Sequence, residues 1–186
     1  MQSDKWAKRA KNEGYRSRAV FKLEEIIKKT NLKKISNVLD LGSAPGGWSQ
    51  FIIKNYPNSK VFAIDILDME KIDGVDFFQI SIEEIESIKE IDLLKGKFNL
   101  VISDIAPNLT GIAAVDCENV LDLNRLTINT AHKFLEKGGT LIMKTFQNNN
   151  LKSLRKNMEL SFNIVQTYKP AASKKQSGEI YLCGVK

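Results

Sequence analysis

The stretch Val38-Leu39-Asp40-Leu41-Gly42-Ser43-Ala44-Pro45-Gly46-Gly47-Trp48 decides the fold of this 186-residue chain. Its first four residues are typical of a short buried strand, and the six-residue turn that follows contains three glycines. A helix is expected next, over residues 48–54. A buried strand, a glycine-rich turn and a helix in this order indicate the first unit of a sheet with parallel strands.

Strands and helices alternate outward from this stretch. Strands are expected at residues 38–41, 60–65, 75–79, 99–104, 140–146, 162–168 and 179–185, and helices after Ser17 and at residues 48–54, 82–94, 118–135 and 151–160. Residues 1–15 lack apolar periodicity, and residues 148–150 are expected to form a turn. This order predicts an α/β fold, with a mainly parallel sheet, helices on both faces and a C-terminal antiparallel hairpin.

Composition limits the class of protein. The length fits a single domain over residues 1–186, and no apolar run is long enough to cross a membrane or to mark a signal peptide. Cys117 and Cys183 have no ligand or redox spacing, which indicates a reduced, intracellular compartment without distinguishing cytoplasm, nucleus and organelle. His132 is the single histidine, which argues against a histidine metal site or a Ser-His-Asp triad.

Charge is concentrated at the N-terminus. Residues 1–34 carry a surplus of +7, whereas the whole chain carries +6, so the remainder sums to −1. A basic arm and helix on a nearly neutral body favour a polyanionic partner such as nucleic acid, because neutralised phosphates release counterions. A segment that serves only solubility is the alternative interpretation.

Functional side chains are expected at the carboxyl edge of the sheet. Asp40, Asp65, Asp104 and Lys144 each stand at or near the end of an expected strand. Ligands of such sheets bind beyond these ends, where glycines allow a close approach and the next helix offers free N–H groups.

The spacing of the turn separates two kinds of cofactor. A dinucleotide fingerprint needs a second glycine where this chain has Ala44, so a nicotinamide dehydrogenase is disfavoured. An S-adenosylmethionine site holds no pyrophosphate but needs an acid about 20 residues on for the ribose, and Asp65 fits. A glycine-rich turn without a ligand stays open as an alternative.

Methyl transfer from a sulfonium to a ribose hydroxyl needs alignment and a base. Lys144 is the candidate base because it interrupts an apolar strand, and desolvation or a nearby cation makes a neutral amine accessible in a lysine. Lys22 could supply that cation, and Asp104 and Glu179 could orient both amines. Each residue also has an ordinary interpretation: a strand-end lysine reaching water, a loop cap before Pro107, or a surface glutamate.

Two other methylation chemistries are disfavoured. Cytosine-C5 enzymes use a cysteine that usually follows a proline, and neither Cys117 nor Cys183 has that setting. Enzymes that methylate exocyclic amines usually carry an Asn/Asp-Pro-Pro-aromatic loop, where this chain has Asp104-Ile105-Ala106-Pro107.

Several motifs in order resemble the FtsJ (RrmJ) family of RNA 2′-O-ribose methyltransferases, over nearly the whole chain. They are Tyr15-Arg16-Ser17-Arg18-Ala19-Val20-Phe21-Lys22-Leu23, Asp40 to Gln50, Ser103-Asp104-Ile105-Ala106-Pro107-Asn108, Met143-Lys144-Thr145-Phe146, and Lys169-Pro170 with Ser177-Gly178-Glu179-Ile180-Tyr181. The resemblance implies a Rossmann-like methyltransferase that uses S-adenosylmethionine and no metal.

The resemblance also implies roles for particular residues. The catalytic tetrad of the family corresponds to Lys22, Asp104, Lys144 and Glu179, with Lys144 as the base. The residues expected to bind the cofactor are Gly42, Ser43, Pro45, Gly46, Gly47, Trp48, Asp65, Ser81 and Asp104. Ser81 is a departure, since the family usually has an acid there against the adenine amine; cofactor binding is expected to persist and to be weaker.

The expected substrate is large-subunit ribosomal RNA, methylated on the ribose of a uridine, and the protein is expected to be a monomer without membrane association. Phosphates would be contacted by basic residues, which position RNA without reading its sequence: Lys8, Arg9, Lys11, Arg16, Arg18, Lys174 and Lys175. A transfer-RNA ribose methyltransferase and a catalytically silent RNA-binding or ribosome-assembly protein are the alternatives.

Overall fold

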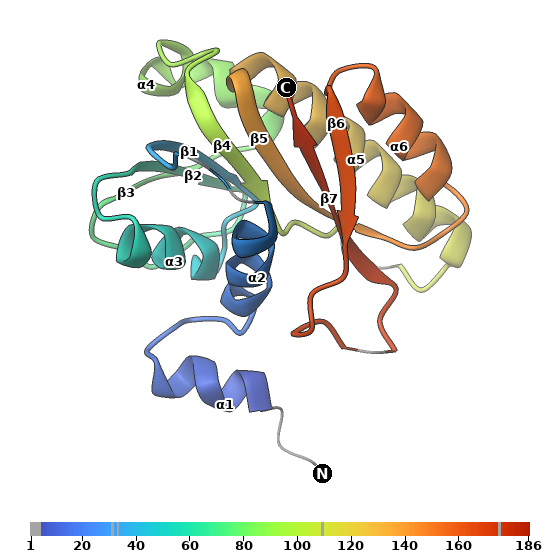
Figure 1. Cartoon of the computed structure of the whole chain (residues 1–186), viewed down its shortest axis with the longest axis horizontal. Coiled ribbons are helices and arrows are strands. Elements are labelled where there is room, and N and C mark those ends of the chain that lie inside the picture. Colours follow the sequence, from blue (N-terminus) through green and yellow to red (C-terminus); the bar gives the residue numbers. More distant parts are fainter. Residues whose placement is uncertain (1–4, 31, 33, 109, 175) are drawn as a thin grey trace.

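The computed structural model describes residues 5–30, 32, 34–108, 110–174 and 176–186. Within them, one seven-stranded sheet has the order β3-β2-β1-β4-β5-β7-β6 (Figure 1). The strands are β1 (Asn37–Leu41), β2 (Lys60–Asp65), β3 (Val75–Gln79), β4 (Phe98–Ser103), β5 (Leu135–Phe146), β6 (Ile164–Tyr168) and β7 (Glu179–Val185). The helices are α1 (Lys5–Asn12), α2 (Val20–Thr30), α3 (Gly47–Asn55), the 3₁₀ helix η1 (Ile82–Ser87), α4 (Lys89–Asp92), α5 (Ala113–Phe134) and α6 (Leu151–Glu159).

The predicted α/β architecture is confirmed. Strands β1 to β5 pair in parallel, and β7 inserts antiparallel between β5 and β6 as the predicted C-terminal hairpin. Helices α2 and α3 cover one face of the sheet, and α5 and α6 cover the other (Figure 1). The central strands β1, β2 and β4 are therefore buried on both sides, as expected for a parallel sheet covered by helices.

Two hydrophobic clusters fill the space between the sheet and its helices. One joins Leu39 and Phe62 to Phe134 of α5, and the other joins Val38 and Ala63 to Trp48 of α3 and Leu23 of α2. Neighbouring residues of one strand thus serve opposite clusters, because side chains alternate along a strand. No helix among the described residues has the length and apolar character needed to cross a membrane.

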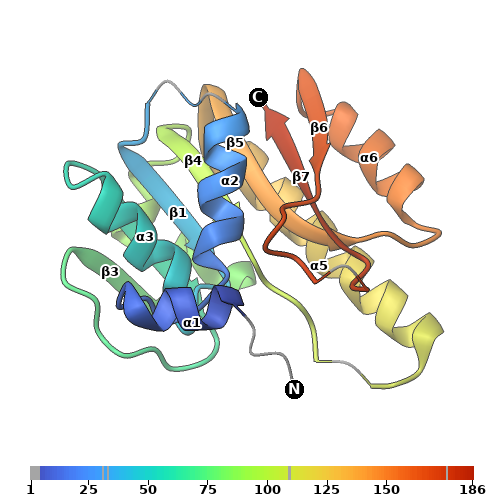
Figure 2. The ribbon, with the colours of Figure 1, turned by 60° about the horizontal axis from the view of Figure 1, so that its bottom comes forward.

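The N-terminal segment, in which residues 1–15 lack apolar periodicity, contains a helix that the sequence analysis did not predict. Residues Lys5–Asn12 form helix α1, which lies across the ends of α2 and α3 in Figure 2. Trp6 packs against Phe21 with ring centroids 5.3 Å apart, and Ala10 is buried. These two anchors are too few to produce a periodic pattern, which is why the sequence did not reveal the helix.

Three further boundaries were wrong. The expected helix over residues 82–94 is broken into η1 and α4, which lie on either side of Ile88. Helix α5 begins at Ala113 rather than residue 118, and β5 begins at Leu135 rather than residue 140, with an irregular register opposite Phe98 and Leu100.

The topology brings distant residues to one edge of the sheet. Asp65 ends β2, and Asp104 directly follows β4, at the carboxyl edge of the parallel strands. Lys144 lies near the end of β5, opposite Tyr181 of β7. Because β7 is antiparallel, its first residue, Glu179, also lies at this edge, opposite Phe146.

Candidate active site

The glycine-rich loop between β1 and α3 is shaped by close packing. Gly42 and Gly46 have positive φ values of 74° and 97°. A Cβ on Gly42 would lie 2.6 Å from the side chain of Ile105, and one on Gly46 would lie 2.6 Å from Ile72. Both positions therefore need glycine for conformation and for space.

Asp65 holds this loop from the end of β2. Its Oδ2 accepts a hydrogen bond from the Ala44 amide at 2.8 Å, and its Oδ1 accepts one from the Leu67 amide, also at 2.8 Å. Each carboxylate oxygen can accept a second bond, so the same group can bind ligand hydroxyls while it fixes the loop.

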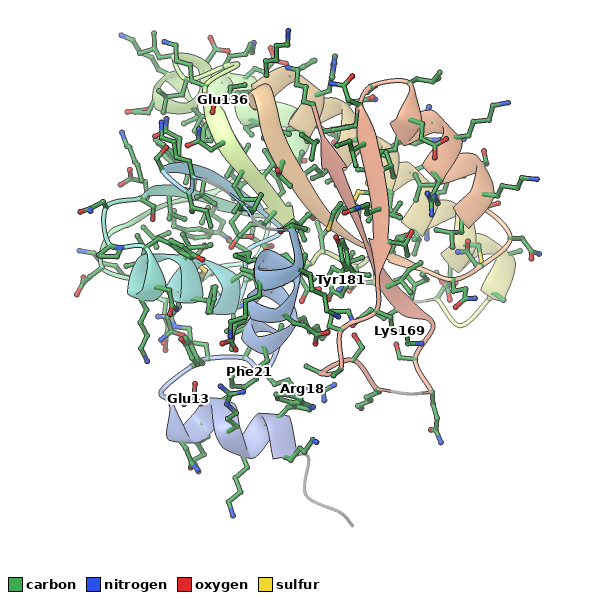
Figure 3. All side chains as sticks on the ribbon, viewed as in Figure 1. Glu13, Arg18, Phe21, Glu136, Lys169 and Tyr181 are labelled. Carbon is green, nitrogen blue, oxygen red and sulfur yellow. The ribbon has the colours of Figure 1, made fainter. Side chains whose placement is uncertain are left out.

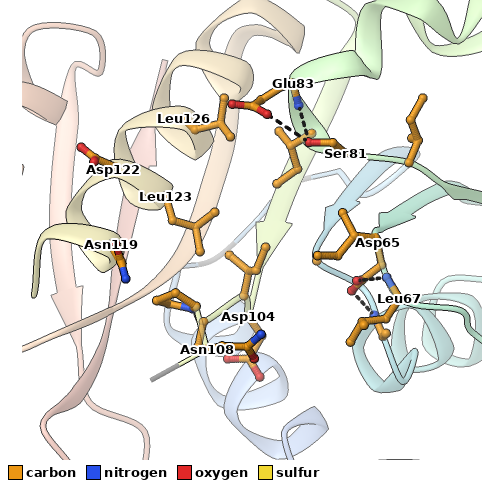
Figure 4. Close-up of a pocket in the computed structure, with 18 residues that line it drawn as sticks. Asp65, Leu67, Ser81, Glu83, Asp104, Asn108, Asn119, Asp122, Leu123 and Leu126 are labelled. Atoms are coloured by element: carbon orange, nitrogen blue, oxygen red, sulfur yellow. Dashed lines mark hydrogen bonds between the residues drawn. The ribbon is translucent and has the colours of Figure 1, made fainter. Parts of the chain in front are cut away.

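A cavity of about 560 Å³ opens beside Asp65 (Figure 4). Its walls come from the loops after β1, β2, β3 and β4 and from one face of α5. The lining residues are Gly42, Ala44, Asp65, Ile66, Leu67, Ile80, Ser81, Ile82, Glu83, Asp104, Ile105, Ala106, Pro107, Asn108, Asn119, Asp122, Leu123 and Leu126. The cavity is large enough for a nucleoside and is mostly apolar, with polar groups at a few places.

A smaller pocket of about 40 Å³ adjoins the cavity and shares Gly42, Ala44 and Asp104 with it. The Ser43 hydroxyl lies at this pocket, is buried, and has no hydrogen-bond partner among the described residues. Trp48 closes the pocket and donates from Nε1 to the Ala19 carbonyl at 2.8 Å. A buried, unsatisfied hydroxyl beside two joined pockets fits an elongated polar ligand such as S-adenosylmethionine.

Asp40 forms the floor of the smaller pocket. It is buried and accepts a hydrogen bond from the Ser49 hydroxyl at 2.6 Å. Burial raises the pKa of Asp40 to about 7, and the nearby charges of Asp104 and Asp65 act in the same direction, while Ser49 opposes the shift.

Two lysine–carboxylate pairs meet beside these pockets. Lys22 Nζ lies 2.8 Å from Glu179 Oε1 and 2.9 Å from Oε2, and both side chains are largely buried. Lys144 Nζ lies 3.3 Å from Asp104 Oδ1 and also donates to the Asp104 carbonyl. The structure thus brings together all four residues of the expected tetrad, from helix α2 and from three strand ends.

Tyr181 links the two pairs, a role that the sequence did not reveal. Its hydroxyl donates to Asp104 Oδ1 at 2.7 Å, and Lys22 Nζ lies 5.8 Å from its ring centroid. Figure 3 shows Tyr181 between α2 and the C-terminal strands. Burial raises the pKa of Tyr181, with the charges of Asp104 and Glu179 adding to the effect, so its hydroxyl acts as a donor. The ring stacks near Trp48, with centroids 5.8 Å apart.

A further contact fixes the position of the Glu179 carboxylate. The Ser173 hydroxyl donates to Glu179 Oε1 at 2.8 Å. Burial alone would raise the pKa of Glu179, but the bonds from Lys22 and Ser173 and the charge of Lys144 outweigh it, so that this pKa is lowered and the side chain stays ionised.

Asn124 of α5 fixes the strand that carries Lys144. Its Nδ2 donates to the Lys144 carbonyl at 3.0 Å, and its Oδ1 accepts from the Thr145 hydroxyl at 2.7 Å. Both Asn124 and Thr145 are buried. Sequence reasoning missed Asn124, although a polar residue on the buried face of an amphipathic helix is a signal that could have found it.

The α5 wall of the cavity was also missed. Asn119, Asp122, Leu123 and Leu126 recur at intervals of three, four and seven residues and so share one face of the helix. Their spacing was visible in the sequence, but which layer that face contacts depends on the topology.

Ser81 lies where the cofactor prediction placed it, on the wall of the cavity. Its hydroxyl accepts from the Glu83 amide at 3.3 Å and so caps η1. The Glu83 carboxylate lies 3.5 Å from the same hydroxyl (Figure 4). The remaining predicted cofactor residues, Gly42, Ser43, Pro45, Gly46, Gly47, Trp48 and Asp104, belong to the loop and pockets described above.

The predicted RNA contacts surround the same end of the molecule. Lys8 and Lys11 are exposed on α1, and Lys174 is exposed in the loop before β7, which projects beside α1 at one end of the molecule (Figure 1). Lys175 lies outside the described residues. Arg18 is half-buried.

Two of the predicted RNA residues are engaged within the protein. Arg9 forms an ion pair with Glu13 at 2.6 Å, and its guanidinium lies 4.1 Å from the ring centroid of Phe21. The Arg16 guanidinium donates to three backbone carbonyls. Their contact with RNA stays a prediction.

In the part of the chain that the structure describes, no group of three or more His, Cys, Asp or Glu residues is placed to hold a metal ion.

Known proteins resemble this chain in sequence and in fold. The sequence model of the FtsJ-like methyltransferase family matches residues 15–186. Ribosomal RNA large subunit methyltransferase E of Coxiella burnetii is 43% identical over 97% of this chain and 89% of its own length. The protein of that name from Chromobacterium violaceum is 42% identical, over 98% of this chain and 91% of its own length.

Solved structures agree with the fold. A Plasmodium falciparum protein assigned as a ribosomal RNA methyltransferase superimposes with a TM-score of 0.79 at 32% identity, covering 92% of this chain and 98% of its own. A Burkholderia thailandensis N1-methyltransferase of 1,6-didemethyltoxoflavin, with S-adenosylhomocysteine bound, gives a TM-score of 0.64 at 14% identity, over 90% and 78% of the two chains. The second likeness concerns the fold alone.

Proposed function

Because the chain belongs to the FtsJ-like methyltransferase family, we propose that it transfers a methyl group from S-adenosylmethionine to the 2′-hydroxyl of a ribose, that of a uridine, in large-subunit ribosomal RNA. The observation that carries this proposal is the position of the Lys144–Asp104 pair. Asp104 lines both joined pockets, and Lys144 Nζ lies 3.3 Å from its carboxylate.

The two pockets divide the cofactor between them. Asp65 and Ser81 on the cavity wall would bind the ribose and the adenine, and the unsatisfied Ser43 hydroxyl would bind the amino-acid end in the smaller pocket. When bound, the cofactor supplies an electrophilic methyl group on a positively charged sulfur. This division places the reactive centre near Asp104, the acidic residue that lines both pockets.

The tetrad activates the hydroxyl. Lys144 Nζ would accept the proton of the 2′-hydroxyl as the hydroxyl oxygen attacks the methyl group that bound S-adenosylmethionine would supply. Asp104 and Tyr181 orient the Lys144 amine, and the Lys22–Glu179 ion pair lies beside them. The cofactor would leave as S-adenosylhomocysteine, and Lys144 would return the proton to water.

The relatives support the substrate. Those from Coxiella burnetii and Chromobacterium violaceum are named for large-subunit ribosomal RNA and match over nearly the full length of this chain. The exposed Lys8, Lys11 and Lys174 at the same end as the site provide charge for phosphates.

The test compares Lys144→Met with Lys137→Met, a control on the same strand whose side chain is exposed. Each protein is incubated with methyl-labelled S-adenosylmethionine and, separately, ribosomal subunits, free ribosomal RNA or transfer RNA. We expect 2′-O-methyl label in large-subunit RNA, about 10² to 10⁴ times slower turnover with Lys144→Met, and unchanged binding of S-adenosylhomocysteine in both variants.

Other outcomes reject particular parts of the proposal. Activity of Lys144→Met within about twofold of the parent would reject Lys144 as the general base. Label in transfer RNA would favour the transfer-RNA ribose methyltransferase, and label on a nucleobase would reject ribose methylation. Cofactor binding without label in any of these RNAs would favour the catalytically silent RNA-binding or assembly protein.

A further inference from the structure

Arg16 connects two loops of the site through their backbones. Its Nη1 donates to the Pro45 carbonyl at 3.1 Å and to the Glu70 carbonyl at 2.7 Å, and its Nη2 donates to the Lys71 carbonyl at 2.9 Å. Pro45 belongs to the glycine-rich loop, while Glu70 and Lys71 belong to residues 66–74, the connection between β2 and β3. A planar guanidinium with five donors suits such a set of carbonyls, and an ammonium does not.

The two loops also pack directly on each other. A Cβ on Gly46 would lie 2.6 Å from Ile72 Cδ1, 2.8 Å from Met69 Sδ and 3.1 Å from Arg16 Nη1. The absence of a side chain at position 46 thus admits both the connection and the guanidinium. Arg16 is 23% exposed at its side chain, which is low for an arginine of a flexible surface arm.

The connection forms part of the cavity wall. Its first two residues, Ile66 and Leu67, line the cavity and are 69% and 62% exposed. Little of the protein packs on these side chains, so their positions depend on how the rest of the connection is held. The side chain of Glu70 contributes little to holding the connection, since its carboxylate is 3.8 Å from Arg16 Nη2 and almost fully exposed.

The backbone around Arg16 is itself held by hydrogen bonds. Its amide donates to Gln50 Oε1 at 3.0 Å, and Gln50 Nε2 donates to the Gly14 carbonyl at 2.9 Å. Lys54 Nζ donates to the Glu13 carbonyl at 3.1 Å. The backbone of residues 13–16 is therefore fixed to α3, the helix that starts at the glycine-rich loop.

From these contacts we propose that Arg16 is a positioning residue for the cofactor, which holds the β2–β3 connection against the glycine-rich loop, and that it does not serve as a phosphate contact for RNA. This inference rests on the proposed function in one respect, that the cavity binds S-adenosylmethionine. Binding RNA through this guanidinium would instead leave three carbonyls without their donor.

The experiment uses Arg16→Lys and Arg16→Met in the full chain, with Lys11→Met as the matched control on α1. Three quantities are measured: the dissociation constant of S-adenosylhomocysteine by calorimetry without RNA, the salt dependence of RNA binding without cofactor, and amide hydrogen exchange of residues 66–74 in the unliganded protein. Circular dichroism verifies that each variant is folded.

We expect both Arg16 variants to bind S-adenosylhomocysteine about tenfold more weakly than the parent, which is the effect of losing a charged hydrogen bond. Exchange of residues 66–74 should accelerate at least about tenfold by the same reasoning. RNA affinity and its salt slope should match the parent. Lys11→Met should do the reverse, with a smaller salt slope and unchanged cofactor affinity.

Arg16→Lys is the decisive variant because it retains the charge. If Arg16 contacts phosphate, Arg16→Lys should behave like the parent for the cofactor, and the salt slope of Arg16→Met should fall by about one unit; that pattern overturns the inference. If the parent itself does not bind S-adenosylhomocysteine, the proposed function fails, and hydrogen exchange still decides whether Arg16 holds the connection. Unchanged hydrogen exchange of residues 66–74 in both Arg16 variants overturns the inference.

Discussion

Asp40 is a buried carboxylate whose protonation couples to folding. Burial raises its pKa to about 7 from an ordinary value of 3.8. Between these two values the folded protein holds a proton that the unfolded chain has released. The contribution of Asp40 to stability is therefore present in full below about pH 4 and is lost as the pH rises through 7.

Asp40→Asn removes this titration, since an amide is neutral at every pH. Relative to the parent, the free energy of unfolding of Asp40→Asn should rise by on the order of 2 kcal/mol between pH 5 and pH 8. Urea unfolding at both pH values, followed by circular dichroism, measures the difference. Asp76→Asn, at an exposed position of β3, should show no such change with pH. An equal offset at both pH values for Asp40→Asn would show that the carboxyl does not titrate in this range.

The sequence alone identified candidate catalytic and cofactor-binding residues, but not the residues whose hydrogen bonds hold them in place. Lys144 was identified because an amine in an apolar strand is anomalous, and Asp65 and Asp104 because acids follow buried strands. Tyr181 gave no such signal, and the weaker signal of Asn124, a polar residue on an apolar helix face, was missed. Their hydrogen bonds, with Asp104 and with the Lys144 backbone, span 77 and 20 positions and exist only once the sheet is assembled.

Strand β7 contains the glycine whose added Cβ would make the shortest contact, Gly184. Its Gly184 lies against the C-terminal part of α6, where a Cβ would be 2.4 Å from Met158 Cε and 2.8 Å from ring atoms of Phe162. Met158 and Phe162 are buried in the hydrophobic cluster that also contains Leu39 and Phe62 of the sheet. The close approach of strand and helix therefore requires glycine, although the backbone conformation does not.

Gly184→Ala should destabilise the protein by about 1–3 kcal/mol, because the Phe162 ring cannot move away as the end of Met158 can. Gly178→Ala is the control, since its nearest neighbour would be 3.7 Å from the new Cβ, and it should change stability by less than about 0.5 kcal/mol. Urea unfolding of the three proteins tests this. Equal stability of both variants would mean that α6 shifts without cost.

Three strands were predicted most closely. The bounds of β2, β3 and β7 match the expectation to the residue. The helix expected over residues 82–94 failed because its apolar residues, such as Ile82, Ile85 and Ile88, recur every three positions, which is the repeat of a 3₁₀ helix rather than an α-helix. Helix α1 was missed because it depends on packing against α2 and the segment that follows it, not on its own pattern.

Across the whole molecule, the fold was predictable because the alternation of strands and helices permits few topologies. The single-domain organisation and the monomeric state remain predictions, as does weaker cofactor binding caused by Ser81. The arrangement of charge could be predicted only in part. The surplus of residues 1–34 was evident, but Arg9 and Arg16 are engaged with the protein, whereas Lys5, Lys8 and Lys11 of α1 are exposed.

The difference between exposed lysines and arginines engaged with the protein predicts how RNA binding depends on salt. If Lys8 and Lys11 bind phosphates, the double substitution to alanine should reduce the slope of log affinity against log salt by about 0.7–0.9 for each phosphate that is no longer neutralised, while binding of S-adenosylhomocysteine stays the same. Lys152 and Lys156 are the matched pair, exposed on α6 over the opposite face of the sheet (Figure 1), and their double substitution should leave the slope unchanged. Titrations of a ribosomal RNA fragment at several salt concentrations give both slopes. An equal reduction in the two variants would mean that the whole surface attracts RNA through its net charge, and the end of the molecule that carries α1 and the tetrad would then have no preference for phosphates.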